Sequence, residues 1–398
     1  MKYDFDTRVD RSGMASIREL MTPESVKEKG MVSFWGAEFE FQTAPCVTEA
    51  IVNWARKGLA AYNCEDEAFF ALVKNWMKLH RGWEIETDWI VPTYGLSFSV
   101  GTIARAFTEP GDGFIGLGPV YHMTWEPVEL NDRKHVDCPL LFDGETYHID
   151  YEKLETLLAE PSNKVLTLCN PHNPIARVWN REELTRLAEL VYRYDKILYS
   201  DEIFADTVYE GVEMLTIDQV TDKPVKWIVA TSLGKTFSMT GVGQANIIIK
   251  DKALRDAFLK QRDKDHYGSF DPMMRAAYFG GYTEEGSSWV KAMMAYCWGN
   301  YELLDSFCKE YIPKIKVIRP QGTYIVWADC RGFGFNSAEK LDDFFKSAGF
   351  VCDQGVRYGS EPGFVRINLA APRAELLKVL SSLQSAVKNL SDKEGKGV

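Results

Sequence analysis

The sequence predicts an α/β protein with a mainly parallel β-sheet covered by helices on both faces, together with a smaller α+β lobe. Two observations lead to this prediction. Over residues 46–280, short apolar β-branched segments alternate with amphipathic helical segments, as in βαβ units. A long helical segment begins near residue 285, and strands and helices of a second group follow it. We therefore expect a large domain at 46–284 and a smaller one built from 1–45 and 285–398.

Composition and charge disfavour several classes of protein. The chain has 398 residues, 45% of them hydrophobic, and a formal net charge of −11. This length is sufficient for two domains, and the negative charge disfavours nucleic acid and anionic membranes as partners. No apolar run reaches the length of about 18 residues that predicts a membrane span. The acidic start, Met1–Asp6, lacks the apolar segment of a secretory signal, so we expect a cytoplasmic protein.

The cysteines and histidines show no metal-binding pattern. None of the eight cysteines forms a CxxC pair, and the six histidines lack the spacing of metal ligands. Scattered cysteines of this kind are typical of reduced thiols that pack as small apolar residues. His172 lies inside a motif of functional appearance, but a structural turn histidine fits the sequence equally well. We expect no metal site.

The first 45 residues are irregular and rich in aromatic side chains. Within them, 34–41 alternates apolar and polar residues, which predicts a half-buried strand or an extended arm. Pro45 then marks the start of a helix and Gly58 its end. Periodicity predicts further helices at 66–81, 97–107 and 181–194, and strands at 89–91, 114–117, 164–168, 196–200, 227–231 and 244–249.

The last third of the chain predicts the smaller lobe. A long helix over 289–311 is expected to bridge to it. The lobe itself is expected to contain strands at 322–329 and 363–369 and helices at 337–348 and 373–389. The polar tail, Ser391–Val398, is expected to be disordered.

Lys235 lies directly after a predicted buried strand, within the segment Ser232–Ser238. A lysine at such a position is unfavourable unless it has a partner or a chemical role. One such role is a Schiff base with an aldehyde cofactor, because desolvation lowers the pKa of the amine and the free base is the nucleophile. Ser232 and Ser238 could then donate to a phosphate. Taken alone, however, the Ser-x-x-Lys spacing favours an ordinary loop lysine in water.

Two other strand ends carry polar residues of complementary chemistry. The prolines around Asn173 fix a turn at the carboxyl end of one strand, where open α/β sheets bind ligands. The next strand runs directly into Asp201, whose carboxylate needs a cationic partner. A protonated pyridine nitrogen would serve as this partner, and the ion pair would keep the nitrogen charged.

Asn173, Asp201 and Lys235 therefore follow three successive strands, at spacings of 28 and 34 residues. This order resembles fold type I enzymes of pyridoxal 5'-phosphate (PLP), the class I/II aminotransferase superfamily, over nearly the whole chain. The motifs are most similar to those of the MalY/PatB-type C–S β-lyases, also called cystathionine β-lyase-like: Tyr3–Asp6, Pro171–Pro174 with Arg177–Trp179, Ser200–Ile203, Gly234–Phe237 and Phe364–Asn368. The resemblance implies a PLP cofactor and a homodimer with active sites at its interface.

The resemblance also assigns residues to the cofactor. Gly95 and Leu96 match the family's phosphate-binding turn, where a glycine before a helix lets backbone N–H groups approach a phosphate. Tyr121 matches the tyrosine that stacks on the pyridine ring; plain core packing is the alternative. Tyr62 is implied to reach the phosphate of a partner subunit, and a packed tyrosine is again the alternative. Asn173 would hydrogen-bond the ring oxygen O3'.

Arg366 is the main candidate for substrate binding. It lies in the middle of an apolar strand, and a buried arginine requires a planar anion. An internal salt bridge would satisfy it, whereas the resemblance implies that it holds the α-carboxylate of an amino acid. Arg357 is a weaker second candidate. The resemblance further implies that Trp35 and Ala37 line the substrate site.

Several positions depart from the family pattern. Glu38 and Glu40 stand where the family has Asp, and Arg18 where it often has Lys. Phe204, which cannot donate a hydrogen bond, replaces a Tyr or His. Ala176 replaces a glycine, and Gly243 stands where Gln or Arg is frequent. These departures make a divergent substrate plausible.

The resemblance assigns Lys235, Tyr121 and Asp201 to catalysis, with Lys235 as general base at Cα. From the resulting carbanion, loss of a β-thiolate gives pyruvate, ammonia and a thiol, whereas reprotonation at the cofactor gives transamination. The residues serve both outcomes, and the subgroup resemblance favours C–S β-elimination on cystathionine- or cysteine-type amino acids. A regulatory protein on the same fold is a third possibility, disfavoured because the key residues are intact.

Overall fold

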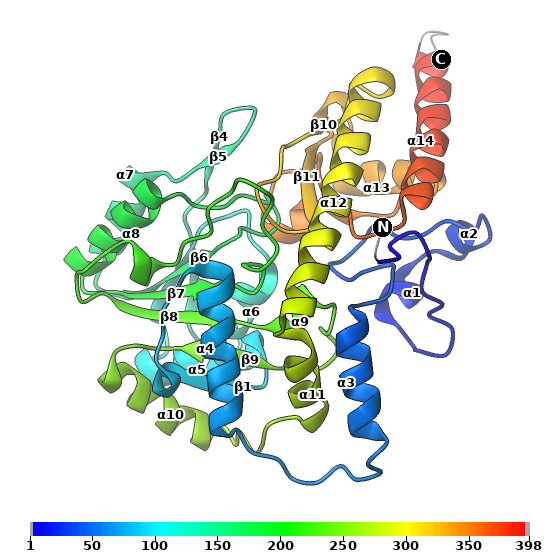
Figure 1. Ribbon diagram of the computed structural model, residues 1–398. Coiled ribbons are helices and arrows are strands. Elements are labelled where there is room, and N and C mark those ends of the chain that lie inside the picture. Colours follow the sequence, from blue (N-terminus) through cyan, green and yellow to red (C-terminus); the bar gives the residue numbers. More distant parts are fainter. Residues whose placement is uncertain (1–2, 395–398) are drawn as a thin grey trace.

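A computed structural model describes residues 3–394 of the chain (Figure 1). The large sheet has seven strands in the order β1-β9-β8-β7-β6-β2-β3. All neighbours in it pair in parallel except β9, which is antiparallel to both β1 and β8. The mainly parallel sheet of the prediction is therefore confirmed. Its strands are β1 (Ile90–Thr93), β2 (Gly113–Gly116), β3 (Lys134–Asp137), β6 (Asn163–Cys169), β7 (Ile197–Asp201), β8 (Lys226–Thr231) and β9 (Ala245–Ile248).

Both faces of the large sheet are buried, which explains why its strands are apolar without alternation. Val165 and Ile228 point to the face packed against α5 (Leu96–Phe107) and α10 (Lys252–Lys264). Their neighbours Leu166 and Val229 belong to the larger core on the opposite face, which includes residues of α4 (Glu67–Arg81), α7 (Tyr151–Ala159) and α8 (Arg181–Arg193). The ends of α4 and α8 follow their capping signals: Asp66 and Asn180 cap the starts, and Gly82 ends α4 in the left-handed conformation.

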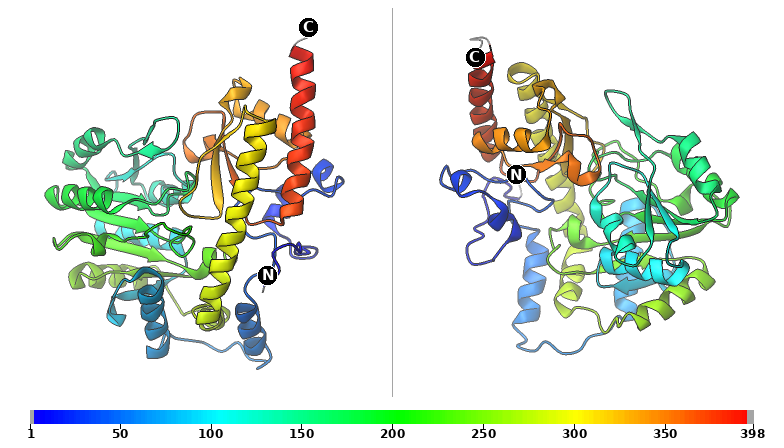
Figure 2. Two further views of the ribbon diagram at one scale, coloured as in Figure 1. Left: turned by 45° about the horizontal axis from the view of Figure 1, so that its top comes forward. Right: turned by 180° about the vertical axis from the view of Figure 1, so that it is seen from behind.

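A second sheet has four antiparallel strands in the order β10-β11-β13-β12. Its strands are β10 (Lys316–Val317), β11 (Ile325–Asp329), β12 (Asp353–Gln354) and β13 (Phe364–Asn368). The long helix α12 (Glu284–Tyr311) passes from the region of the large sheet to this second sheet (Figures 1 and 2). Helices α13 (Ala338–Ser347) and α14 (Arg373–Glu394) accompany it. Residues 391–394, predicted as part of a disordered tail, instead lie in α14, and residues 395–398 are outside the described residues.

The structure decides between the two alternatives predicted for residues 34–41. They form an extended arm and no strand. The backbone of Phe34 bonds to Val351 and Asn368, and the N–H of Glu40 donates to the carbonyl of Ala370. Glu40 is buried beside the aromatic residues, so the alternation of residue types does not separate core from solvent here. The reason is that the arm is enclosed by other segments rather than lying across one face of a sheet.

The remaining elements are short or peripheral. Helix α3 ends at Ala55, three residues before Gly58, and packs against α11. Two short helices, α1 and α2, interrupt the segment expected to be irregular. The bounds are α1 (Ile17–Met21), α2 (Glu24–Lys27), α3 (Pro45–Ala55), α6 (Glu126–Glu129), β4 (Leu141–Phe142), β5 (Tyr147–His148), α9 (Leu233–Thr236) and α11 (Pro272–Gly281).

Candidate active site

The three strands that end in predicted site residues are neighbours in the sheet. Cys169 at the end of β6 is paired with Asp201 on β7, and Asp201 is paired with Ala230 on β8. Because the strands are parallel, their carboxyl ends meet at one edge. Asn173 and Lys235 follow β6 and β8 within a few residues, so the fold gathers the three candidates at this edge.

Lys235 lies in the one-turn helix α9, which Ser232 caps by accepting from the N–H of Gly234. Its Nζ donates to the carbonyl oxygen of Ala37 at 3.2 Å and lies 5.7 Å from the centre of the Phe204 ring. Burial, helped by the charge of Arg366, lowers the pKa of Lys235 to about 8. About a tenth of this amine is therefore unprotonated at pH 7, far more than for an ordinary lysine, which favours a role as nucleophile or general base.

The carboxylate of Asp201 is buried, and a backbone hydrogen bond stabilises its negative charge only partly. The N–H of Ile203 donates to its Oδ1 at 3.2 Å. Burial raises the pKa of Asp201 to about 7, although the charge of Lys235 acts in the opposite direction. The group would be ionised fully only beside a further cation. This requirement agrees with the predicted pairing of Asp201 with a pyridinium nitrogen.

Arg366 is already engaged in the buried salt bridge that was the alternative expectation. Its Nη2 lies 2.7 Å from Oδ2 of Asp353, the residue paired with it across β12 and β13. Its Nη1 donates to Oδ1 of Asn173 at 2.9 Å, which leaves the amide nitrogen of Asn173 free to donate elsewhere. Burial opposes the charge of Arg366, but Asp353 outweighs it, and the pKa of Arg366 lies above its ordinary value.

Tyr121, Trp35 and Ala37 lie around this centre. The backbone N–H of Tyr121 donates to the carbonyl of Asn173 at 3.2 Å. The guanidinium of Arg357 lies 5.5 Å from the Trp35 ring centre. Ala37 accepts from Lys235 and also from the hydroxyl of Tyr324, at 3.1 Å. These predicted residues are brought together with Lys235 and Arg366.

The predicted phosphate turn has the expected backbone. Gly95 precedes α5 with a φ of 88°, in the left-handed region that favours glycine. A Cβ built there would lie 3.6 Å from Cα of Gly243, so the two glycines approach closely. Leu96 is the first residue of the twelve-residue helix α5, whose N-terminal N–H groups suit an anion. The hydroxyl of Ser232, predicted as a phosphate donor, donates to the carbonyl of Gln244 at 2.7 Å within this chain.

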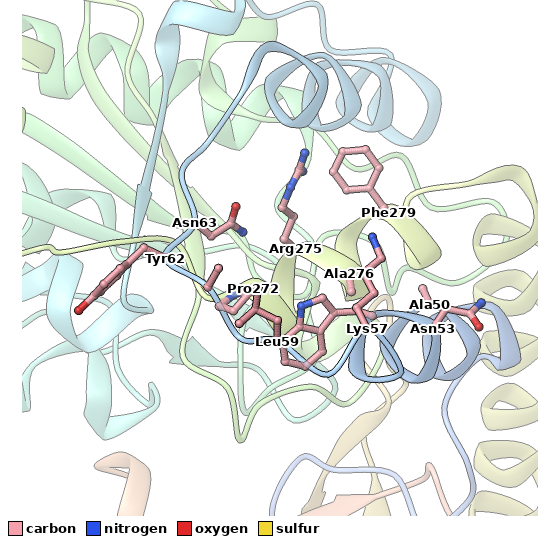
Figure 3. A pocket seen from close by; sticks show the side chains of 12 residues that line it. Ala50, Asn53, Lys57, Leu59, Tyr62, Asn63, Pro272, Arg275, Ala276 and Phe279 are labelled. Carbon is pink, nitrogen blue, oxygen red and sulfur yellow. The ribbon is translucent and has the colours of Figure 1, made fainter.

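Tyr62 lies apart from the other candidates. It is fully exposed in the loop between α3 and α4. It borders a cavity of about 430 Å³ between α3 and α11 that also includes Leu59 and Phe279, and Figure 3 shows its ring directed away from these residues. Within a single chain the side chain of Tyr62 is not packed, so the alternative prediction of a packed tyrosine is wrong there.

The sequence reasoning missed a polar network behind the catalytic edge. Oδ2 of Asp206 accepts from the indole of Trp76 at 3.0 Å and from the hydroxyl of Thr236, next to Lys235, at 2.8 Å. Arg81 pairs with Glu202, next to Asp201, at 2.7 Å. All of these side chains except that of Thr236 come from α4 or the loop after β7. The signal that could have revealed them is the charge of Glu202, which directly follows the buried strand β7.

The acidic departures at the arm form ion pairs with arginines. Glu40 contacts Arg18, with Arg11 at 3.5 Å and Arg8 at 3.7 Å. Glu38 lies 3.0 Å from Arg11. The longer acids and the arginine at position 18 therefore form one charge cluster. The charges of Glu38, Glu40 and Arg18, which replace other residues of the family pattern, are therefore paired within this cluster.

Two other departures alter packing or backbone. Phe204 is buried and packs edge-on against Tyr324 at 5.6 Å between ring centres. Ala176 has a φ of 57°, a left-handed conformation in which a glycine would be unstrained.

His172 has a structural role. It is buried, and its Nε2 lies 3.0 Å from the carbonyl oxygen of Pro119. Burial lowers the pKa of His172 to about 4, so the ring is neutral. The eight cysteines are free thiols, six of them buried. Among residues 3–394, no cluster of potential metal ligands exists, and no helix is long and apolar enough to cross a membrane.

Comparison with known proteins identifies the class that this fold and site define. A family model described as aminotransferase class I and II matches residues 38–383. The chain therefore belongs to the aminotransferase class I and II family.

Two relatives are similar to the chain over nearly its full length. The chain is 30% identical over 386 residues to cystathionine β-lyase PatB of Bacillus subtilis, covering 96% of this chain and 100% of PatB. It is 26% identical over 389 residues to protein MalY of Escherichia coli, covering 97% and 99% of the two chains. These are two of the proteins whose subgroup the sequence motifs predicted.

Solved structures agree in fold. Cystalysin from Treponema denticola, whose structure contains a PLP cofactor, superposes with a TM-score of 0.91 at 33% identity, covering 98% of this chain and 100% of cystalysin. A PLP-bound C–S lyase from Staphylococcus hominis gives a TM-score of 0.87 at 26% identity, covering 96% and 98%. The predicted fold, that of fold type I PLP enzymes, is confirmed.

Proposed function

We propose that the protein is a PLP-dependent C–S β-lyase that acts on cystathionine- or cysteine-type amino acids and releases pyruvate, ammonia and a thiol. The observation that carries the proposal is the meeting of buried Lys235, Asp201 and Asn173 at the carboxyl edge of the sheet. PatB, a relative over the full chain, is named a cystathionine β-lyase. An enzyme is thus favoured over a regulatory protein.

The residues present fit the cofactor. Asp201 is a buried carboxylate with no cationic side chain within 4.0 Å among residues 3–394, as a site for a pyridinium would be. The amide nitrogen of Asn173 is available to O3', and Tyr121 adjoins it for stacking. Gly95 and Leu96 offer backbone N–H groups to the phosphate at the start of α5. The amine of Lys235, with its lowered pKa, is available to the aldehyde.

PLP, when bound, supplies an electron sink for the carbanion at Cα. Arg366 would hold the α-carboxylate on the guanidinium edge that Asp353 leaves free. Lys235 would remove the proton from Cα, because its amine is buried and partly unprotonated. The Cβ–S bond then breaks, and the thiolate leaves with the bonding electrons and takes up a proton. Water completes the conversion of the remaining fragment to pyruvate and ammonia.

An aminotransferase is the second candidate, because the family model carries that description. Measurement of pyruvate release from L-cystathionine, L-cysteine and an S-alkyl cysteine, with and without a 2-oxo acid, separates the two. Pyruvate without a 2-oxo acid supports the lyase. Amino transfer to the 2-oxo acid with no pyruvate overturns it.

We also propose a cytoplasmic homodimer in which Tyr62 reaches the cofactor phosphate of the partner subunit. The exposure of Tyr62, Leu59 and Phe279 on one surface supports the dimer, since apolar side chains gathered at the surface are typical of interfaces.

The free cysteines suit a reducing compartment. The proposed domains are 46–284 for the cofactor and 1–45 with 285–398 for closing over substrate.

A further inference from the structure

A cavity of about 720 Å³ lies beside the candidate active site. One wall comes from the segment after β2, with His122, Trp125, Glu126 and Glu129. The other wall comes from the turn before β13, with Val356 and Arg357. The N–H of Val120 donates to the carbonyl of Tyr358 at 2.9 Å, which joins the two walls.

Two side chains of the cavity wall contact residues of the predicted substrate site. The rings of Tyr121 and His122 are in contact, with centres 4.5 Å apart. On the other wall, Arg357 lies 3.8 Å from Oδ1 of Asp353, whose Oδ2 holds Arg366. A ligand bound to Arg366 is therefore separated from the cavity by the width of one side chain.

Arg357 carries a positive charge that its neighbours do not neutralise. The single carboxylate of Asp353 also serves Arg366, with Nη2 at 2.7 Å, and it accepts from the N–H of Gly36 at 2.8 Å. Arg357 reaches it only at 3.8 Å, beyond hydrogen-bond distance, and its side chain is 44% exposed. Two guanidinium groups thus share one carboxylate, and the outer one is open to a further anion.

The opposite wall carries the complementary charge. Within residues 3–394, the only cationic group within 4.0 Å of the Glu126 carboxylate is His122, at 3.9 Å. Burial lowers the pKa of His122 below its ordinary value, so this ring is mainly neutral at pH 7. Glu126 therefore has no cationic partner at hydrogen-bond distance among the described residues, and Glu129 lines the same wall.

We propose that this cavity binds the leaving group of substrates whose thiol carries an amino-acid head group of its own, with Arg357 holding the distal carboxylate and Glu126 the distal ammonium. The inference rests on the proposed function and specifies its substrate class. A ligand with both charges matches both walls, whereas an S-alkyl group would leave Arg357 and Glu126 without a partner. In the reaction, the Cβ–S bond breaks, the released amino-acid thiolate takes up a proton, and water converts the remainder to pyruvate and ammonia.

The test compares kcat/KM for L-cystathionine with that for S-ethyl-L-cysteine in the PLP-loaded enzyme. Arg357→Gln and Glu126→Gln should each lower the ratio about tenfold, mainly through KM, because each removes one charge-assisted contact. The control is Arg331→Gln, an arginine whose side chain is 43% exposed in the short helical turn after β11. It should leave the ratio unchanged.

Two outcomes would overturn the proposal. An unchanged ratio in both variants would show that the cavity does not meet the leaving group. An equal loss of kcat/KM for both substrates would show that Arg357 acts, through Asp353, on the amino-acid part that the two substrates share. Circular dichroism of each variant establishes that it has folded.

A binding measurement separates failure of this inference from failure of the proposed lyase. Trp125 lines the cavity, so its fluorescence should report L-homocysteine, the thiol released from cystathionine. The dissociation constant should rise about tenfold in Arg357→Gln, and the signal should be lost in Trp125→Phe. If no substrate yields pyruvate but this titration succeeds, the lyase proposal fails and the site stands. If pyruvate forms and the titration shows no effect of Arg357, the site is refuted.

Discussion

Lys235 and Asp201 are ionisable groups placed where burial disfavours their charged forms. The pKa of Lys235 is lowered to about 8 and that of Asp201 is raised to about 7. Shifts of opposite sign in two residues of one site are typical of groups tuned for chemistry. The lowered pKa of Lys235 was expected from the sequence, and for Asp201 the sequence predicted the need for a cationic partner, because a charged residue at the end of an apolar strand is unfavourable without one.

The lysine has a direct test. Lys235→Ala should lower kcat for pyruvate release by at least about 10²–10⁴-fold, the contribution of a positioned general base. Lys252→Ala, which alters an exposed lysine on α10, is the matched control and should retain activity. Retention of lyase activity by Lys235→Ala would contradict the assignment.

Asp201 predicts how the stability of the cofactor-free protein depends on pH. Its folded pKa of about 7 lies above the ordinary value of 3.8, so the folded state binds the proton more tightly than the unfolded state. The free energy of unfolding should therefore fall as pH rises from about 4 to 7, by about 4 kcal/mol from this residue. Urea unfolding at several pH values measures it.

The contribution of Asp201 can be isolated by substitution. Asp201→Asn should flatten the fall in stability, and added PLP should do the same in the unmodified protein, because a pyridinium would stabilise the carboxylate. An equally steep fall in Asp201→Asn would assign it to other groups.

At the scale of elements, α4 supports the catalytic edge from behind. Its Trp76 donates to Asp206, which also accepts from Thr236, the neighbour of Lys235. Its Arg81 pairs with Glu202, the neighbour of Asp201. Such a network is fully buried, so each group depends on its partner. The helix was predicted from periodicity, but its contacts were not, because they join residues about 120 positions or more apart, a separation that local pattern does not encode.

Asp206→Ala tests this support. It leaves the indole N–H of Trp76 and the hydroxyl of Thr236 without their acceptor, each at a cost of about 1–3 kcal/mol. The urea midpoint should fall accordingly, and kcat should fall with it because Thr236 adjoins Lys235. Asp256→Ala, from the exposed pair with Lys252, should change stability by less than about 1 kcal/mol. Equal effects of the two substitutions would argue against the network.

At the scale of the whole molecule, the exposed surface around Tyr62 suggests a second copy of the chain. Sedimentation or gel filtration should give the mass of two chains, and Tyr62→Phe should weaken PLP binding without changing that mass, since only the hydroxyl would be lost. A monomer would contradict the dimer. A dimer with unaltered PLP affinity in the variant would contradict the role of Tyr62 alone.

The sequence by itself determined the main sheet, most helices and the three strand-end residues. Periodicity and strand-end polarity are local properties, so Asn173, Asp201 and Lys235 could be recognised without coordinates. Only the tertiary structure decided that Arg366 is paired with Asp353, that 34–41 is an arm rather than a strand, and that a cavity of opposite charges lies beside the site. These features arise where distant segments meet, and the burial and charge of a side chain there depend on neighbours that sequence spacing does not reveal.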